Sequence, residues 1–180
     1  MIYNFLSNKQ GQITMLTTPT IERPPLAASP AWPKVLKGRR TYQALSDFSR
    51  TDRIDLVKQG VPARLLTTLV DDMQTTQERL YGWLGIARAT ANRKVKADSL
   101  LNRDESERTL GLARLIGQVE TVVAESGNPE GFAAAPWLAG WLQRPNAALG
   151  GRPPGDFIDT ADGRALVSGL IAQMQTGAYA

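Results

Sequence analysis

The chain has 180 residues, of which 42% are apolar and 21% are charged, and its formal net charge is +4. This length allows one ordinary hydrophobic core or two small cores that are closely joined. No window approaches the roughly 18 consecutive apolar residues that a membrane-spanning helix needs. The first residues have neither the basic start nor the long apolar run of a signal peptide. We therefore expect a cytoplasmic protein with no membrane partner.

The chain contains no cysteine and no histidine. Their absence excludes disulfides, thiol nucleophiles, Ser-His-Asp triads and the usual zinc ligand sets. Catalysis by carboxylates or lysine stays possible, but the commonest catalytic side chains are missing. We predict that the chain is not an enzyme and that it has no catalytic residues, no metal site and no cofactor.

Charge is distributed unevenly along the chain. Residues 1–50 hold seven Lys or Arg against two Asp or Glu, whereas residues 105–180 hold five against eight. A basic front and an acidic back indicate that the two ends of the chain meet different partners.

Residues 1–40 are predicted to form a flexible, Pro-rich basic arm rather than a domain. Proline interrupts regular structure at five positions, which are Pro19, Pro24, Pro25, Pro30 and Pro33. The basic residues between Lys34 and Arg40 contact a DNA backbone or stay solvated, and the solvated tail is the simpler interpretation. Met15 is an alternative start of translation.

Helical patterns begin at residue 41. A short apolar stripe contains Tyr42, Leu45 and Phe48, and Pro62 suits the first position of a later helix. That helix places apolar residues at spacings of three and four, which gives one buried face. The residues of this face are Leu66, Leu69, Val70 and Met73.

The next two helices have the spacing of a helix-turn-helix motif. Thr75 and Glu78 have the spacing of a capping box, and Gly85 suits the left-handed end of the same helix. A second helix follows from about Ala87 to Asp98. Two short helices joined by a tight turn that contains glycine are typical of DNA-binding domains.

The second helix of this motif carries the predicted DNA contacts. Five residues fall within one arc of about 140°, and these are Arg88, Ala89, Asn92, Arg93 and Lys96. Arg and Asn suit base edges in the major groove, and Lys suits a phosphate. Ala87, Ala91 and Val95 form a separate apolar arc that we expect to face the preceding helices, while Lys94 lies off the polar stripe and is expected to meet solvent or a phosphate. A merely solvated helix face is the alternative, but no acid occurs from residue 79 through residue 97.

Residues 105–180 are predicted to be helical as well. Asn102 or Asp104 starts a long helix, which runs from Glu105 to about Ser126. This helix either bridges the two halves and supplies a dimer surface, or is simply the core helix of the second half, or does both. A helix starting at Pro136 is expected to bury Trp137, Leu138, Trp141 and Leu142, and a loop rich in Pro and Gly follows. This loop matches no nucleotide-binding glycine motif. A last helix is expected to bury Leu166, Val167, Leu170, Ile171 and Met174 and to end at Gly177.

Over roughly residues 50–180 the sequence resembles the Xre/MbcA/ParS antitoxins, the partners of RES-domain toxins in bacterial type II toxin–antitoxin modules. The matching segments are Gly60–Pro62, Leu80–Ile86 with Thr90 and Arg93, Glu105–Arg108, Trp141–Leu142, Pro145–Asn146, Leu149–Gly151, Pro153, Thr160 with Gly163, and Gly177–Tyr179. The C-terminal segments are the specific ones. Pro154 and Gly155 depart from the family's loop pattern.

The resemblance implies an all-α, homodimeric antitoxin with an Xre-like helix-turn-helix domain at residues 41–104 and a small helical domain for toxin binding and dimerisation at residues 105–180. It would bind its own operator DNA and occlude the NAD site of an NAD-consuming RES-domain toxin. The implied DNA contacts are Arg88, Ala89, Thr90, Asn92, Arg93, Lys94 and Lys96. The implied toxin contacts are Asn146, Leu149, Gly150, Gly151, Arg152, Pro153, Gly177, Ala178, Tyr179 and Ala180. The alternative is a free-standing dimeric helix-turn-helix regulator without a toxin partner.

Overall fold

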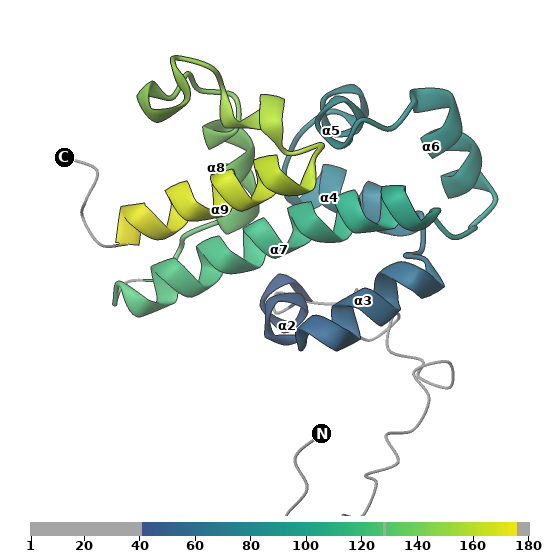
Figure 1. The fold of residues 1–180 in the computed structure, drawn as a ribbon, viewed down its shortest axis with the longest axis horizontal. Helices are drawn as coiled ribbons and strands as arrows, with labels where there is room; N and C mark the ends of the chain where they lie inside the picture. Colours follow the sequence, from purple (N-terminus) through teal and green to yellow (C-terminus); the bar gives the residue numbers. More distant parts are fainter. Residues whose placement is uncertain (1–40, 128, 176–180) are drawn as a thin grey trace, which may run out of the picture.

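The computed structural model describes residues 41–127 and 129–175 (Figure 1). Within these ranges the chain forms helices and two isolated β-bridges, but no strand. The expected all-α fold is therefore confirmed. The predicted arm at residues 1–40 and the chain end at residues 176–180 lie outside the described residues.

The elements follow one another closely along the chain. The first five described helices are α2 (Thr41–Asp47), α3 (Arg50–Gln59), α4 (Arg64–Asp72), α5 (Gln77–Leu84) and α6 (Arg88–Lys96). The long helix α7 (Arg103–Glu125) and the short helix α8 (Ala134–Trp141) come next. Two 3-10 turns, η2 (Ala147–Leu149) and η3 (Pro154–Phe157), lead into α9 (Ala161–Gln175).

Helix α7 is the central element of the fold. Figure 1 shows it crossing the middle of the molecule, with α2 and α3 on one side, α9 alongside it on the other, and α4–α6 around its N-terminal end. A capping box starts the helix, because Asn102 accepts from the backbone N–H of Glu105 and Glu105 accepts from the backbone N–H of Asn102, both at 2.8 Å. The start expected near Asn102 is confirmed.

One hydrophobic core joins the helices of both halves. Its largest side chains are less than 2% exposed, and they are Leu45, Leu65, Leu66, Leu69, Met73, Leu80, Leu84, Leu112, Ile116, Leu138, Leu142 and Ile158. Since these residues come from α2, α4, α5, α7, α8 and the segment before α9, the helix-turn-helix and the C-terminal helices pack against the same central helix.

Three expected helix boundaries and caps are wrong by one or two residues. Helix α4 starts at Arg64, because Pro62 instead lies in an isolated bridge with Leu100. Helix α5 is capped by Thr76, whose side chain accepts from the backbone N–H of Arg79 at 3.2 Å, rather than by Thr75. Helix α8 starts at Ala134, before Pro136. Thr75 and Thr76 are neighbours of the same type, so the pattern does not decide which of them caps α5, and the other two starts differ by two residues, as helix boundaries commonly do.

Helix α9 buries most of its expected apolar face. Val167, Leu170 and Ile171 are at most 5% exposed, but Leu166 is 46% exposed. Thr160 caps the start of the helix, because its hydroxyl accepts from the backbone N–H of Gly163 at 3.1 Å. In the part of the chain that the structure describes, no helix has the length and the apolar character that crossing a membrane requires.

Helix α2 lies unusually close to α7 at Gly117. A Cβ atom at this position would come within 2.3 Å of the backbone oxygen of Tyr42 and 2.4 Å of the hydroxyl of Ser46. Gly117→Ala is therefore expected to push the two helices apart and to lower the free energy of unfolding by about 1–3 kcal/mol, as overpacked cores do. Urea-induced unfolding followed by circular dichroism measures this loss.

Gly169 in α9 provides the matched control for Gly117. A Cβ atom at Gly169 would meet nothing within 4 Å. Gly169→Ala should leave the protein unchanged or stabilise it by about 0.5–1 kcal/mol, the ordinary preference of a helix for alanine. Equal unfolding curves for the two variants would contradict the close packing of α2 on α7.

Candidate functional site

The turn between α5 and α6 has the geometry of a helix-turn-helix motif. Gly85 adopts φ 58° and ψ 35°, and this left-handed conformation confirms its expected role as the end of α5. The backbone N–H of Ile86 donates to the oxygen of Tyr81 at 2.9 Å, and the Ile86 side chain is 6% exposed. The turn is thus anchored in the core, and it fixes the direction in which α6 leaves it.

The polar face of α6 is open to solvent. Five of the predicted DNA contacts are exposed, namely Arg88, Ala89, Asn92, Arg93 and Lys96, and Thr90 is half-buried. Ala91 is fully buried, whereas Ala87 is exposed, so the expectation that Ala87 faces the preceding helices is wrong. Ala87 is the N-cap of α6, where the chain is only entering the helix, so it need not follow the helical face.

Lys94 differs from the other predicted DNA contacts. Its ammonium group forms an ion pair with the carboxylate of Glu105, which is 5% exposed. The expectation that Lys94 meets solvent is therefore wrong, because the buried carboxylate at the start of α7 attracts it. The pair ties α6 to α7 and holds the exposed face of α6 in one orientation.

A second candidate surface is the loop between α8 and α9. Asn146 is 8% exposed, and its side chain accepts from the backbone N–H of Ala148 at 2.9 Å. Its backbone N–H donates to the oxygen of Arg152 at 3.1 Å, which closes the loop on itself. Gly150 and Gly151 adopt φ 65° and 82°, as expected for glycine in a tight loop. Asn146 thus shapes the loop from inside, while the tip of the loop is exposed.

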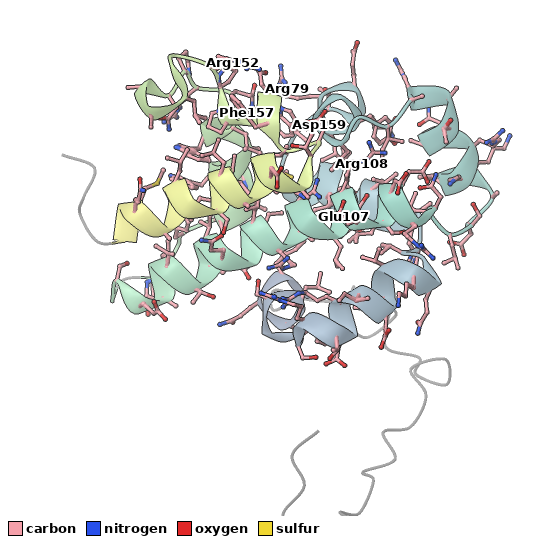
Figure 2. All side chains as sticks on the ribbon, viewed as in Figure 1. Arg79, Glu107, Arg108, Arg152, Phe157 and Asp159 are labelled. Carbon is pink, nitrogen blue, oxygen red and sulfur yellow. The ribbon has the colours of Figure 1, made fainter. Side chains whose placement is uncertain are left out.

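Arg152 is held in a fixed position on this loop. Its guanidinium group lies 4.3 Å from the centroid of the Phe157 ring and 3.6 Å from the carboxylate of Asp156 (Figure 2). A cation over an aromatic face is stabilised by the ring quadrupole. Gly150, Gly151 and Arg152 are exposed. The remaining predicted loop contacts, Leu149 and Pro153, are half-buried. The exposed tip therefore presents a shaped backbone and one oriented cation.

The loop is also packed directly on the helix-turn-helix. A Cβ atom at Gly155 would come within 2.5 Å of the indole nitrogen of Trp83 in α5 and 2.8 Å of the backbone oxygen of Leu142. The backbone N–H of Gly155 donates to that same oxygen at 2.9 Å. The sequence analysis did not predict this contact. Its one signal was Gly155 itself, which departs from the family's loop pattern.

A further junction joins the two halves at Arg108. Figure 2 shows Arg108, Asp159 and Arg79 gathered where α5, α7 and the segment before α9 meet. A Cβ atom at Gly85 would lie 3.2 Å from a guanidinium nitrogen of Arg108 and 3.6 Å from the Cβ atom of Asp159. Glu107 forms an ion pair with Arg164 of α9. These contacts bring the turn of the helix-turn-helix against the C-terminal helices.

The tryptophans of α8 lie at the surface rather than in the core. Trp137 and Trp141 are half-buried and stack with ring centroids 6.1 Å apart and planes 7° apart. Phe132, which is 39% exposed, extends the row at 6.0 Å from Trp137. Leu138 and Leu142, each directly after a tryptophan in the sequence, are fully buried in the core. The expected core face is thus confirmed for Leu138 and Leu142, whereas Trp137 and Trp141 are only partly buried and pack against the edge of the core.

Trp141→Ala is therefore expected to leave the protein folded. A fully buried tryptophan costs about 3–5 kcal/mol when truncated, but here only part of the ring is buried and the stacked pair adds about 0.5–1.5 kcal/mol. We expect a loss of about 1–2 kcal/mol in a thermal unfolding experiment. Leu142→Ala, in the fully buried position beside it, should cost about 2–5 kcal/mol. An equal or larger loss for Trp141→Ala would contradict its surface placement.

Comparison with known proteins places the two surfaces in two different antitoxin domains. The model of the antitoxin Xre-like helix-turn-helix domain matches residues 52–114, and the model of the antitoxin Xre/MbcA/ParS C-terminal toxin-binding domain matches residues 129–177. A curated relative from Sphingobium sp. (strain YBL2), the Prs ADP-ribosylating antitoxin, is 43% identical over 139 residues, which cover 77% of this chain and 87% of the relative. The chain belongs to the Xre/MbcA/ParS antitoxin family.

Membership in this family defines the class of protein and the domain in which each of the two surfaces lies. The chain is an antitoxin of a toxin–antitoxin system, with a helix-turn-helix domain and a toxin-binding domain. Its partner is a toxin, and the family indicates a regulatory role rather than catalysis. Helix α6 lies in the matched helix-turn-helix domain, and the loop around Arg152 lies in the matched toxin-binding domain. Across residues 41–127 and 129–175 the antitoxin has no group of three or more Asp or Glu side chains arranged to hold a metal ion.

Proposed function

We propose that this antitoxin occludes the NAD site of a RES-domain toxin and binds the operator DNA of its own operon. The observation that carries the proposal is that one chain exposes two separate surfaces of different chemistry. One is the cationic face of α6, and the other is the shaped Pro/Gly loop of the toxin-binding domain. We also propose that the antitoxin acts by binding alone and has no enzymatic activity.

The chemistry of α6 supports operator binding. Arg88 and Arg93 are exposed and suit guanine, whose two acceptors match a guanidinium group, and Asn92 suits adenine. Lys96 fits a phosphate, and the small Ala89 allows a close approach. Thr90 is half-buried at the edge of this face. Lys94 contributes by holding α6 against Glu105.

The C-terminal segment supports toxin binding in two ways. Gly150, Gly151, Arg152 and Pro153 offer a preorganised edge, which Asn146 and Leu149 help to shape from within. Beyond α9, the proposed blocking residues are Gly177, Ala178, Tyr179 and Ala180. Among these residues, Tyr179 offers an aromatic side chain, and aromatic side chains often anchor a protein segment in a partner's pocket.

The chemistry of the toxin is inferred from the relative. The relative's name joins an antitoxin to ADP-ribosylation, and NAD is the usual donor of ADP-ribose. A toxin that uses NAD would be silenced by any segment that fills its NAD pocket. We further propose that the antitoxin is a homodimer, because dimers let helix-turn-helix proteins bind two half-sites at once.

Co-expression with the neighbouring RES-domain protein tests the toxin partnership. We expect the two proteins to purify together and the antitoxin to restore growth of cells that express the toxin. The same antitoxin should shift a DNA fragment from its own promoter in a gel. Promoter binding without any toxin partner would instead favour the free-standing dimeric regulator. Loss of NAD in a reaction that contains the antitoxin alone would overturn the proposal that it is not an enzyme.

A further inference from the structure

A wide groove on the antitoxin lies outside both surfaces described above. It has a volume of about 890 Å³ and runs along α7 between α3 and α9. Among the described residues, six cationic side chains line it, whereas only two carboxylates do. The cations are Arg50, Arg53, Lys58, Arg103, Arg114 and Arg164. We call this site the α3–α7–α9 groove.

The cations of the α3–α7–α9 groove are poorly neutralised. Glu107 is engaged by the buried Arg164, which also donates to the backbone oxygen of Ile158 at 2.9 Å. Partial burial, followed by repulsion from Arg53, Arg164 and Arg50, lowers the pKa of the Arg114 guanidinium below its usual range. Within the described residues, Arg50 and Arg114 have no ion-pair partner. Converging cations of this kind attract a negatively charged occupant.

The floor of the groove is aliphatic. Its apolar lining side chains are Ile54, Val57, Leu110, Leu115, Val122, Ala161 and Ala165, and Ile54 is 46% exposed. No aromatic side chain occurs among the described residues that line the groove. Single-stranded nucleic acids and nucleotides bind largely by stacking on aromatic rings. A groove lined by aliphatic and cationic side chains instead fits an amphipathic protein segment that carries Asp or Glu beside aliphatic side chains.

A second copy of the antitoxin is a poor occupant. A two-fold interface brings the same surface of both copies together, so Arg50 and Arg114 of one copy would face the same cations of the other. Like charges across an interface disfavour association. The occupant is therefore a different protein, and the toxin is the protein partner that the family supplies.

We propose that the α3–α7–α9 groove binds an acidic amphipathic segment of the toxin. The inference rests on the toxin partnership and adds a second contact beyond the C-terminal domain. Since α3 and the first half of α7 lie within the matched helix-turn-helix region, residues 52–114, the toxin would touch both domains of the antitoxin.

The test reverses the charge of Arg50 and Arg114, the two groove cations that have no ion-pair partner among the described residues. The neighbouring toxin, stripped of antitoxin and immobilised, is titrated with wild-type antitoxin and with R50E/R114E. We expect the Kd to rise at least about tenfold, because charged partners lose their attraction and meet repulsion instead. The conservative variant R50K/R114K should stay within about threefold of wild type, since the charges remain.

Matched controls separate the groove from net charge and from folding. R64E/R79E makes the same change in charge, and both of its positions are exposed and lie outside the groove. It should leave the Kd for the toxin unchanged, and R50E/R114E should keep the helical circular dichroism and the Tm of the wild type. If R50E/R114E has a lower Tm than the wild type, the Kd of the folded variant R50K/R114K for the toxin is measured at low and high salt instead. A charge-dependent contact in the groove must weaken as the salt concentration rises.

The possible results distinguish this inference from the proposed function. If wild-type antitoxin does not bind the toxin, the proposed function itself fails. If wild type binds and a folded R50E/R114E binds equally well, only the groove inference is overturned. If R50E/R114E binds the toxin as well as wild type but binds promoter DNA more weakly, the occupant of the groove is nucleic acid, and the groove inference is again overturned.

Discussion

Removal of Gly177–Ala180 is expected to abolish neutralisation of the toxin and to leave promoter binding unchanged. The buried face of α9 ends before these residues, because Val167, Leu170 and Ile171 hold the helix in the core. The truncated antitoxin should therefore fold and keep its loop around Arg152. What it loses is the aromatic side chain of Tyr179, which is proposed to fill the NAD pocket.

Growth of cells that express the toxin measures this effect. Wild-type antitoxin should restore growth, and the truncated form should not. Tyr179→Phe is the matched control, since it keeps the aromatic ring and the chain end and should retain most of the rescue. Full rescue by the truncated antitoxin would show that the loop alone is sufficient and would contradict the proposed blocking role.

Arg93→Ala is expected to weaken promoter binding by about 1–3 kcal/mol and to relax the preference for one base pair. Arg93 is exposed on the face of α6 that enters the major groove in the proposed complex. Lys96→Ala should weaken binding about equally for all sequences and reduce the salt dependence by about one phosphate contact. Fluorescence anisotropy with promoter and scrambled DNA at two salt concentrations separates these results.

Lys94→Ala completes the comparison within α6. Because Lys94 is paired with the buried Glu105, its loss leaves a buried carboxylate without its cation, which is destabilising. We expect a lower Tm rather than a change in sequence preference. Unchanged promoter binding by Arg93→Ala, or a sequence-specific loss with Lys94→Ala at full Tm, would contradict the assignment of the polar face of α6.

Features that depend on near neighbours in the sequence were predictable. The left-handed turn at Gly85 requires only residues within a few positions of each other, whereas the cap predicted at Thr75 falls on its neighbour Thr76. The exposed stripe on α6 also follows from the helical period, because residues three and four apart share a face.

Features that depend on distant residues were not predictable in the same way. The tryptophans of α8 have the spacing of a core face, yet Leu138 and Leu142 occupy the core while the two indole rings stack at the surface. The contact of Gly155 with Trp83 and the pairing of Lys94 with Glu105 join elements that no local pattern connects. The α3–α7–α9 groove likewise exists only after three separate helices have packed.

The kinetics of NAD consumption by the purified toxin test occlusion of its NAD site most directly. The toxin is assayed over a range of NAD concentrations at several fixed concentrations of antitoxin. If the antitoxin fills the NAD pocket, the apparent KM for NAD should rise with antitoxin while kcat stays constant, because NAD and antitoxin exclude each other. A fall in kcat at constant KM would contradict occlusion and place the inhibitory contact elsewhere on the toxin.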